Sequence, residues 1–277
     1  MATTVSIETI QEYEMGVLHY IDEVCREHGL KYYLAYGSLL GAVRHQGFIP
    51  WDDDMDIYMP RPDYARFLEV TNANPHHRYK VCSVDNEKRW TAPLPKVIDT
   101  YTVLKQIGHR EQMDLGIYID IFVLDGVPAE EKVREKWISK LNCLHKLWVG
   151  CEYEKEAKPG SGLKGQVTAL ASKLLHTFLG AHQAAKNLCA EARRYRYEDC
   201  LWVGDNECQV AKDRQKCIVE KSWFGEGGTM LFGDLQCPVP AQWDKLLTKW
   251  YGDYMTLPPE EARVSHHKYE LEIKNEM

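Results

Sequence analysis

Four aspartates stand together in WDDDMDIYM, residues 51–59, and two of them have the spacing of a metal site. Asp54 and Asp56 lead into an apolar run that predicts a β-strand. Residues two apart on a strand face the same side, about 7 Å apart, so both carboxylates point into one cleft while Met55 and Ile57 turn into the core. Carboxylates this close repel each other unless a cation lies between them. Oxygen-only ligands suit Mg²⁺ or Mn²⁺, and Mg²⁺ is commonly held by one or two carboxylates together with substrate phosphates.

An acidic surface turn is the alternative interpretation of this cluster taken alone. Asp56 favours the metal site, because it lies inside an apolar run where an unpaired charge is costly to bury. Strand alternation turns Asp53 away from Asp54 and Asp56. Asp52 lies two residues before Asp54 and would face the same side on a continuous strand, but it is expected in the loop after Trp51.

A second polar group precedes the aspartates. The strand-like run 32–36 ends in Gly37 and Ser38. Glycine permits a close backbone approach and a positive φ, and serine adds a hydroxyl, so this turn can hold a phosphate opposite the metal. Residues 39–44 predict one or two helical turns that bring Arg44 and His45 near the site. Arg44 either binds phosphate with its fork-shaped guanidinium or pairs with an aspartate to hold the loop.

A third carboxylate lies in GIYIDIFVLD, residues 116–125, which alternates like a strand. Asp120 falls on the face opposite to Ile119 and Ile121, and a lone aspartate in such a strand needs a partner or a metal. Asp125 precedes Gly126 and is interpreted as a turn residue. Lys96, on the predicted strand 95–99, is the basic residue expected closest to the site, with a solvated lysine as the alternative.

A strand ending in Gly-Ser and followed by Asp-x-Asp resembles the nucleotidyltransferase superfamily. The longer string YGSLLGAVRHQGFIPWDDDMDI resembles the LicD family of phosphotransferases, which includes phosphocholine transferases and has the fukutin and fukutin-related ribitol-phosphate transferases as more distant relatives. The resemblance covers residues 30–125 and returns in WYGDYMTLPPE and SHHKYE near the end, and it implies that this tail packs near the active site.

The resemblance implies a Mg²⁺- or Mn²⁺-dependent transferase, in which Asp54, Asp56 and Asp120 form the catalytic and metal-binding set. It leaves open whether Asp120 is a ligand or the base that accepts the proton of the acceptor hydroxyl. The expected substrate-binding residues are Gly37, Ser38, Arg44, His45, Asp52 and Lys96. His266 and His267 either contact a phosphate or serve in capping and packing.

The expected donor is a CDP-alcohol such as CDP-choline, with CMP as the leaving group; ethanolamine, glycerol and ribitol phosphates remain open. The expected acceptor is a hydroxyl of a cell-surface glycan, such as lipopolysaccharide or teichoic acid, or of its lipid-linked precursor. The same carboxylates serve a nucleotidyltransferase that acts on a small molecule, which is the alternative enzyme. A binding module that has lost its chemistry is the non-enzymatic alternative, although no aspartate of the set is missing.

The predicted helices and strands indicate an α+β fold with a mostly helical C-terminal half. The resemblance implies that its core is a nucleotidyltransferase-like mixed sheet flanked by helices. We expect one domain over residues 1–277, with the core at 30–125, a helical excursion at 128–200 and a C-terminal packing segment at 201–277. Residues 223–240 are expected to be irregular, anchored by Phe232 and Val239. Helices are expected at 6–28, 62–71, 129–150, 166–197 and 241–251, and strands at 32–36, 56–59, 79–84, 95–99, 102–106, 116–125, 201–203 and 217–219.

Composition narrows the function classes. A formal net charge of −7 disfavours nucleic acid as a partner. Nine cysteines without a CxxC pair indicate reduced thiols, and Cys200, Cys208 and Cys217 fit no standard zinc motif. No apolar run reaches the roughly 18 residues that a membrane-spanning helix needs, and the polar N-terminus is no secretory signal. A cytoplasmic protein is therefore expected, either free or at the inner face of the membrane. The basic cluster Arg193, Arg194 and Arg196 either contacts an acidic acceptor or a membrane surface, or is a solvated helix end.

Overall fold

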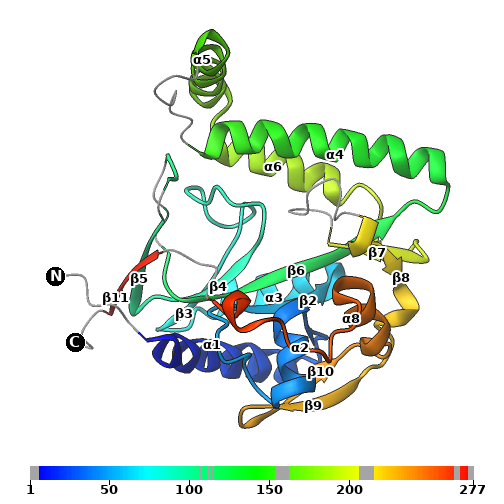
Figure 1. The fold of residues 1–277 in the computed structure, drawn as a ribbon. Helices are drawn as coiled ribbons and strands as arrows, with labels where there is room; N and C mark the ends of the chain where they lie inside the picture. The colour runs from blue at the N-terminus through cyan, green and yellow to red at the C-terminus, as the bar shows by residue number, and fades with distance from the viewer. Residues whose placement is uncertain are drawn as a thin grey trace.

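The fold is α+β and is built around a mixed, curled sheet (Figure 1). The computed structural model describes residues 6–106, 108–110, 113, 115–153, 162–205, 215–264 and 269–273. The sheet order is β1-β2-β6-β4-β3, and β7 and β8 extend it beyond one end of β6. Strands β2 and β6 are parallel, whereas the other neighbours are antiparallel. The strands are β1 (Tyr33–Leu34), β2 (Met55–Pro60), β3 (Tyr79–Cys82), β4 (Lys96–Asp99), β6 (Tyr118–Val127), β7 (Trp202–Gly204) and β8 (Val219–Glu220).

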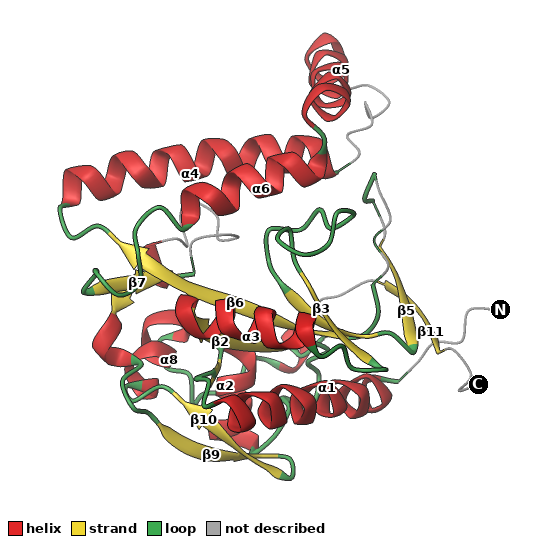
Figure 2. Cartoon of the chain, turned by 180° about the vertical axis from the view of Figure 1, so that it is seen from behind, coloured by secondary structure: helices red, strands yellow, loops and turns green. Residues whose placement is uncertain are grey.

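Helices cover the sheet on both sides (Figures 1 and 2). One side carries α1, and the long helix α4 lies beside α6 on the other side. Among the residues that the structure describes, no helix has both the length and the apolar character needed to cross a bilayer. The helices are α1 (Ile7–His28), α2 (Tyr36–His45), α3 (Arg61–Ala73), α4 (Glu131–Glu152), α5 (Gly162–Leu179), α6 (Ala181–Ala192) and α8 (Trp243–Tyr251).

Helix α1 has the bounds that its sequence predicts. The Ser6 hydroxyl accepts a hydrogen bond from the Thr9 amide at the N-terminus, and Gly29 adopts a left-handed conformation with φ 65° at the C-terminus. Between these caps, apolar residues at helical spacing, including Val17 and Leu18, pack into the main core.

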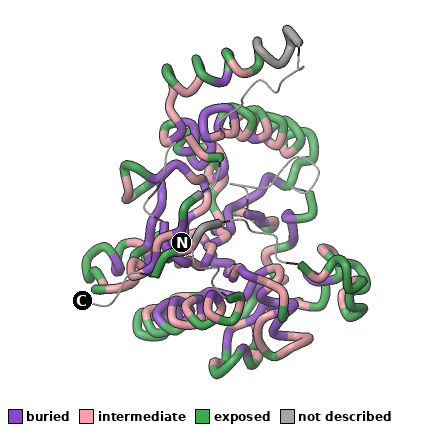
Figure 3. The backbone as a smooth tube through the Cα atoms, turned by 60° about the vertical axis from the view of Figure 1, so that its left-hand side comes forward, coloured by how far each residue is buried: buried purple, intermediate pink, exposed green. Residues whose placement is uncertain are grey.

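The two faces of the central sheet differ in character. Met55, Ile57, Ile119 and Ile121 are fully buried and pack with α1 in the main core. The residues that alternate with them, beginning with Asp56, face the opposite side. Figure 3 shows the result, with buried chain running through the centre of the molecule and exposed chain along the outer helices. Asp56 and Asp120 therefore lie on the side opposite the main core, where Tyr58 and Phe122 continue the same face in a second hydrophobic cluster.

Asp125 is a strand residue, and its assignment to a turn is wrong. Strand β6 continues to Val127 because β7 pairs with its end, with Asp125 opposite Gly204. The Asp125 carboxylate is buried and accepts two hydrogen bonds from Arg61, at 2.7 Å from Nε and 2.6 Å from Nη2. This bidentate ion pair joins the end of β6 to the start of α3.

The segment 223–240 is not irregular. It contains the antiparallel hairpin β9 (Gly228–Phe232) and β10 (Leu235–Val239), joined by Gly233 and Asp234. Gly233 supplies the positive φ, 61°, that a two-residue turn needs. The predicted anchors Phe232 and Val239 are buried in the main core, so the anchors are confirmed although the strands between them were missed.

Two further expectations change in the C-terminal half. The predicted helix 166–197 is two helices, because Gly180 with φ 75° breaks the chain between α5 and α6. The strand β5 (Thr102–Gln106), which the sequence predicts, pairs with an unpredicted strand β11 (Tyr269–Ile273) near the end of the chain. Pairing between residues this far apart leaves no local signal in the sequence.

Candidate active site

Three neighbouring strands bring Asp56, Asp120 and Lys96 into one row. Asp56 on β2 is in register with Asp120 on the parallel strand β6, and Asp120 is in register with Lys96 on β4. The Lys96 ammonium forms an ion pair with the Asp120 carboxylate and lies 3.6 Å from the centre of the Tyr118 ring. The structure therefore brings together the two carboxylates that the sequence places on separate strands, and Lys96 joins them.

The electrostatic environment of Asp56 disfavours its charged form. Burial is the largest cause, and the neighbouring charges of Asp54, Asp120 and Asp52 add to it, so the pKa of Asp56 lies well above its usual value of 3.8. Lys96 opposes this shift only in part. A cation among these carboxylates would remove the repulsion.

The aspartates before β2 lie in a short loop that directly follows the turn at Pro50 and Trp51. Oxygen atoms of Asp52, Asp53 and Asp54 all lie within 4.8 Å of one another. The expectation that Asp53 turns away from Asp54 is wrong, because β2 begins only at Met55 and strand alternation does not extend back to the loop. Asp53 nevertheless does not line the cavity described below, whereas Asp52, Asp54 and Asp56 do. The Asp53 side chain is instead buried within the acidic group.

Gly37 is placed for close approach rather than for a left-handed turn. Helix α2 begins at Tyr36, and the positive φ, 40°, falls on Tyr36 itself. A Cβ atom on Gly37 would lie 2.8 Å from Oδ2 of Asp52, closer than real contacts allow. The absent side chain therefore leaves the space that the Asp52 carboxylate occupies.

Ser38 holds the backbone of the metal motif. Its buried Oγ accepts a hydrogen bond of 2.8 Å from the amide of Asp56. The Gly-Ser pair therefore fixes the aspartates from the side of α2, with Gly37 beside Asp52 and Ser38 beside Asp56. Gly37 lines the cavity described next, whereas Ser38 lies behind its wall.

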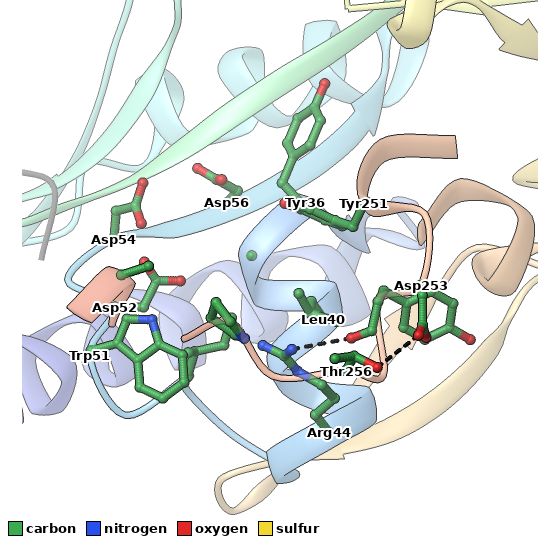
Figure 4. A pocket seen from close by; sticks show the side chains of 15 residues that line it. Tyr36, Leu40, Arg44, Trp51, Asp52, Asp54, Asp56, Tyr251, Asp253 and Thr256 are labelled. Carbon is green, nitrogen blue, oxygen red and sulfur yellow. Dashed lines mark hydrogen bonds between the residues drawn. The ribbon is translucent and has the colours of Figure 1, made fainter. Parts of the chain in front are cut away.

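A cavity of about 470 Å³ opens in front of the aspartates (Figure 4). Asp52, Asp54 and Asp56 line one side of it, and Arg44 extends toward it from the opposite side. Arg44 Nη1 donates to the carbonyl oxygen of Tyr254 at 3.1 Å, while its buried Nε has no hydrogen-bond partner among the described residues. No ion pair with an aspartate is recorded for Arg44 within the described chain, so the geometry favours the phosphate-binding alternative.

His45 lies beside the cavity rather than in its lining. Its ring meets Trp51 edge-on at 6.4 Å between centroids, and its buried Nε2 has no partner in the described part of the chain. Burial and the nearby Arg44 charge lower the pKa of His45, which keeps the ring neutral at physiological pH.

The C-terminal part of the chain completes the cavity. Tyr251, Asp253, Tyr254 and Thr256 line it, and Figure 4 shows Tyr251 directed toward the space in front of Asp56. The resemblance of WYGDYMTLPPE to the family predicts that this stretch lies near the active site, but it assigns no role to any single residue of the stretch. His266 and His267 lie outside the described residues.

Glu14 of α1 is a site neighbour that was not anticipated. It is 2% exposed, and the charges of Asp54, Asp52 and Asp56 add to its burial in raising its pKa far above the ordinary value. One turn earlier, Gln11 donates a 2.8 Å hydrogen bond to the carbonyl oxygen of Asp52. The sequence does contain a signal, because Glu14 falls on the apolar stripe of α1, where a charged residue needs an explanation.

The residues present fit a hard divalent cation. The donors are carboxylate oxygens, which Mg²⁺ and Mn²⁺ prefer, and those of Asp52, Asp53 and Asp54 lie within 4.8 Å of one another. Asp54, Asp56 and Asp120 are the residues that would hold it from β2 and β6, and the loop at Asp52–Asp54 lies beside them.

The other candidate groups gain no support. Cys200 and Cys217 are reduced thiols, and Cys208, the third residue considered for zinc, lies outside the described residues. The basic cluster is paired locally, with Arg193 bonded to Asp85, Arg194 to Glu191 and Arg196 to neighbouring acids. These pairs favour the solvated helix end over a contact surface.

Comparisons with known proteins agree with this geometry. A family model described as "LicD/FKTN/FKRP, nucleotidyltransferase domain" matches residues 29–140, which include strands β2 and β6. A Haemophilus influenzae protein named "Lipopolysaccharide cholinephosphotransferase LicD" is 32% identical over 264 residues, covering 94% of this chain and 95% of that protein. The chain belongs to the LicD family. Two uncharacterized Rickettsia proteins share shorter stretches, with 31% identity over 106 residues in R. prowazekii and 46% over 48 residues in R. typhi. The aspartates lie within the matched LicD domain, whereas Tyr251, Asp253, Tyr254 and Thr256, which line another side of the cavity, lie beyond the matched residues.

Proposed function

We propose that this protein transfers phosphocholine from CDP-choline to a hydroxyl group of lipopolysaccharide or of a related cell-surface glycan. The observation that carries the proposal is that Asp56 lines a cavity of about 470 Å³ and is in register with Asp120 on the neighbouring strand, in a chain that matches a lipopolysaccharide cholinephosphotransferase over 94% of its length. The proposal includes dependence on Mg²⁺ or Mn²⁺.

Asp54, Asp56 and Asp120 would hold the cation. When bound, the cation neutralises charge on the donor diphosphate and on the departing CMP phosphate. Lys96 fixes Asp120 through their ion pair, and Ser38 fixes the backbone of Asp56. Both contacts preorganise the carboxylates before substrate arrives.

Arg44 is the residue best placed to bind the donor phosphates. Its guanidinium is anchored by Tyr254 and retains an unpaired Nε donor, so it can bind a phosphate oxygen opposite the aspartates. Gly37 keeps the adjoining backbone open at the cavity, and Asp52 lines the cavity beside it. His45 supports this wall through its contact with Trp51.

The aromatic wall suits a choline group. Tyr251 and Tyr254 line the cavity near Asp253, and a quaternary ammonium group binds well against ring faces with a carboxylate nearby. We expect this combination to favour choline over the neutral alcohols glycerol and ribitol. The cationic end of the donor would then lie at the C-terminal wall and the diphosphate at the aspartates.

In the proposed reaction, the acceptor hydroxyl oxygen forms a bond to the choline-bearing phosphorus, and the bond from that phosphorus to the CMP oxygen breaks. CMP leaves with the electron pair. The proton of the hydroxyl passes to Asp120 or to solvent. A lipid-linked acceptor would bring the protein to a membrane surface during the reaction.

The experiment compares two reactions of the purified protein. CDP-choline, CDP-ethanolamine, CDP-glycerol and CDP-ribitol are each incubated with Mg²⁺ and acceptor glycan, and CMP release is measured with and without EDTA. CTP with phosphocholine is incubated in parallel, and pyrophosphate release is measured. CMP release from CDP-choline that EDTA abolishes supports the proposal, whereas pyrophosphate release without it would replace the proposal by a nucleotidyltransferase. Neither product, with CDP-choline still bound, is the outcome expected of an inactive binding module.

A further inference from the structure

Glu14 is a buried carboxylate with an unpaired oxygen. It lies in the second turn of α1 at 2% exposure, and its Oε2 has no hydrogen-bond partner among the described residues. Asp22, another buried acid of the same helix, provides a contrast. Asp22 accepts a hydrogen bond of 2.9 Å from the Tyr32 hydroxyl and forms a 2.7 Å ion pair with Arg26. The helix therefore satisfies its ordinary buried acid and leaves Glu14 Oε2 without a donor.

Glu14 lies on the face of α1 that contacts the aspartates, although it does not itself line the cavity. Gln11, three residues earlier on the same face of α1, reaches the carbonyl oxygen of Asp52, so this face contacts the aspartate loop. The charge on Glu14 also acts on Tyr118, the ring that lies against Lys96. The charge on Glu14 thus interacts with the aspartates and with the ring that lies against Lys96.

A carboxylate in this position requires a positive partner. Burying an unpaired charge is costly, and nearby carboxylates increase the cost. Carboxylate oxygens grouped within 4.8 Å of one another, as at Asp52–Asp54, are the donor set of a hard divalent cation. An added glutamate oxygen raises the charge and the number of donors that such an ion meets.

We propose that Glu14 contributes a carboxylate oxygen from α1 to a divalent-cation site that it shares with the Asp52–Asp54 loop. The inference rests on the metal dependence within the proposed function and extends it to a residue outside the matched family domain, which begins at residue 29. It makes α1 part of the catalytic centre rather than a packing helix alone. Cation binding then joins α1 to the start of β2.

The test measures Mn²⁺ binding directly, without turnover. Calorimetry and electron paramagnetic resonance of free Mn²⁺ give the dissociation constant for the full-length wild type, for Glu14→Gln and for the matched control Glu12→Gln, each alone and with CMP present. Glu12 is an exposed glutamate of the same helix, so its substitution removes the same charge away from the site. Circular dichroism confirms that each variant is folded.

We expect Glu14→Gln to weaken Mn²⁺ binding by on the order of tenfold to a hundredfold, as loss of a supporting metal contact does, and Glu12→Gln to leave it within about twofold of wild type, as expected for a remote surface charge. The metal-free Glu14→Gln protein is expected to melt at a higher temperature than wild type, because the unpaired charge is gone. Equal Mn²⁺ affinity in wild type and Glu14→Gln would overturn the inference and leave the proposed function standing. Absence of Mn²⁺ binding by the wild type would overturn both. If Glu14→Gln does not fold, Glu14→Asp provides the test against Glu12→Asp, and equal affinity of that pair overturns the inference.

Discussion

Asp54 and Asp56 carry most of the proposed chemistry and do so at a cost to the metal-free fold. Asp54→Asn and Asp56→Asn are each expected to lower transferase activity by roughly a hundredfold or more, because each removes a charged ligand while keeping the shape. Each is also expected to raise the metal-free melting temperature, by about 2–4 °C for every kcal/mol of repulsion relieved. Activity assays and thermal melts of the same preparations measure both effects. The exposed Asp234→Asn is the matched control and is expected to change neither.

Asp53 tests whether the loop or the strand sets the geometry. Its buried carboxylate lies with those of Asp52 and Asp54, so Asp53→Asn is expected to reduce activity comparably to Asp54→Asn. Strand alternation alone predicts a mild effect, and an Asp53→Asn protein with near wild-type activity would contradict the loop geometry. Activity at saturating Mg²⁺ is the measurement.

Asp120 has two candidate roles that a metal titration separates. Asp120→Asn is expected to cut turnover strongly in either role, because the residue lies opposite Asp56 and is fixed by Lys96. Loss of a ligand raises the Mg²⁺ concentration needed for half-maximal rate. Loss of a base lowers the rate at saturating Mg²⁺ and leaves that concentration nearly unchanged. A lower melting temperature with full activity of the folded protein would remove Asp120 from the site.

The raised pKa of Asp56 makes metal-free stability depend on pH. The folded protein holds the Asp56 proton more tightly than the unfolded chain, so this residue stabilises the fold fully below its usual pKa of 3.8. That contribution is lost as pH rises from 3.8 through the higher folded value. Between about pH 4 and neutral pH, the metal-free melting temperature is therefore expected to fall less steeply in Asp56→Asn than in wild type. Mg²⁺ is expected to stabilise the wild type more at neutral pH than at acid pH, because the cation competes with the proton. If the melting temperatures of metal-free wild type and Asp56→Asn change equally with pH, this account is contradicted.

At the scale of elements, the contact between α2 and β2 holds the motif in place. Ser38→Ala leaves the amide of Asp56 without its acceptor and is expected to cost about 1–3 kcal/mol of unfolding free energy. Urea denaturation measures the loss, and activity is expected to fall with it because the catalytic backbone moves. Ser222→Ala removes an exposed hydroxyl and serves as the control. Unchanged stability of Ser38→Ala would show that the hydrogen bond does not position Asp56.

The strands that carry the aspartates could be predicted because their signal is local. Ile57 and Ile119 alternate with Asp56 and Asp120, and this pattern alone assigns the faces of β2 and β6. The register that sets Asp56 opposite Asp120 could not be predicted, because pairing of two distant parallel strands is determined by the whole sheet. Asp53 was misassigned because the boundary between loop and strand lies two residues after it.

At the scale of the whole molecule, the cavity is assembled from segments far apart in the chain. The aspartates lie near residue 54, whereas Tyr251 and Tyr254 come about 200 residues later and reach the site because α8 packs against α2. The hydrogen bond from Arg44 to Tyr254 fixes this junction. Sequence reasoning indicated that the C-terminal stretch lies near the site but not which residues face the donor, because that depends on how α8 packs.

The wall from the C-terminal segment is expected to determine which alcohol the donor carries. Tyr251→Leu removes the ring face and keeps an apolar side chain, so a quaternary ammonium loses a cation–π contact of about 1–2 kcal/mol. The KM for CDP-choline is therefore expected to rise roughly fivefold to thirtyfold at that energy. CDP-glycerol has no cation, so any turnover with it is expected to keep nearly the same KM. Tyr251→Phe retains the ring and is the matched control, with a KM for CDP-choline close to that of wild type. Steady-state kinetics on both donors provide the measurement. An equal rise in KM for the two donors would assign Tyr251 to general packing, and choline recognition would then have to come from another part of the cavity.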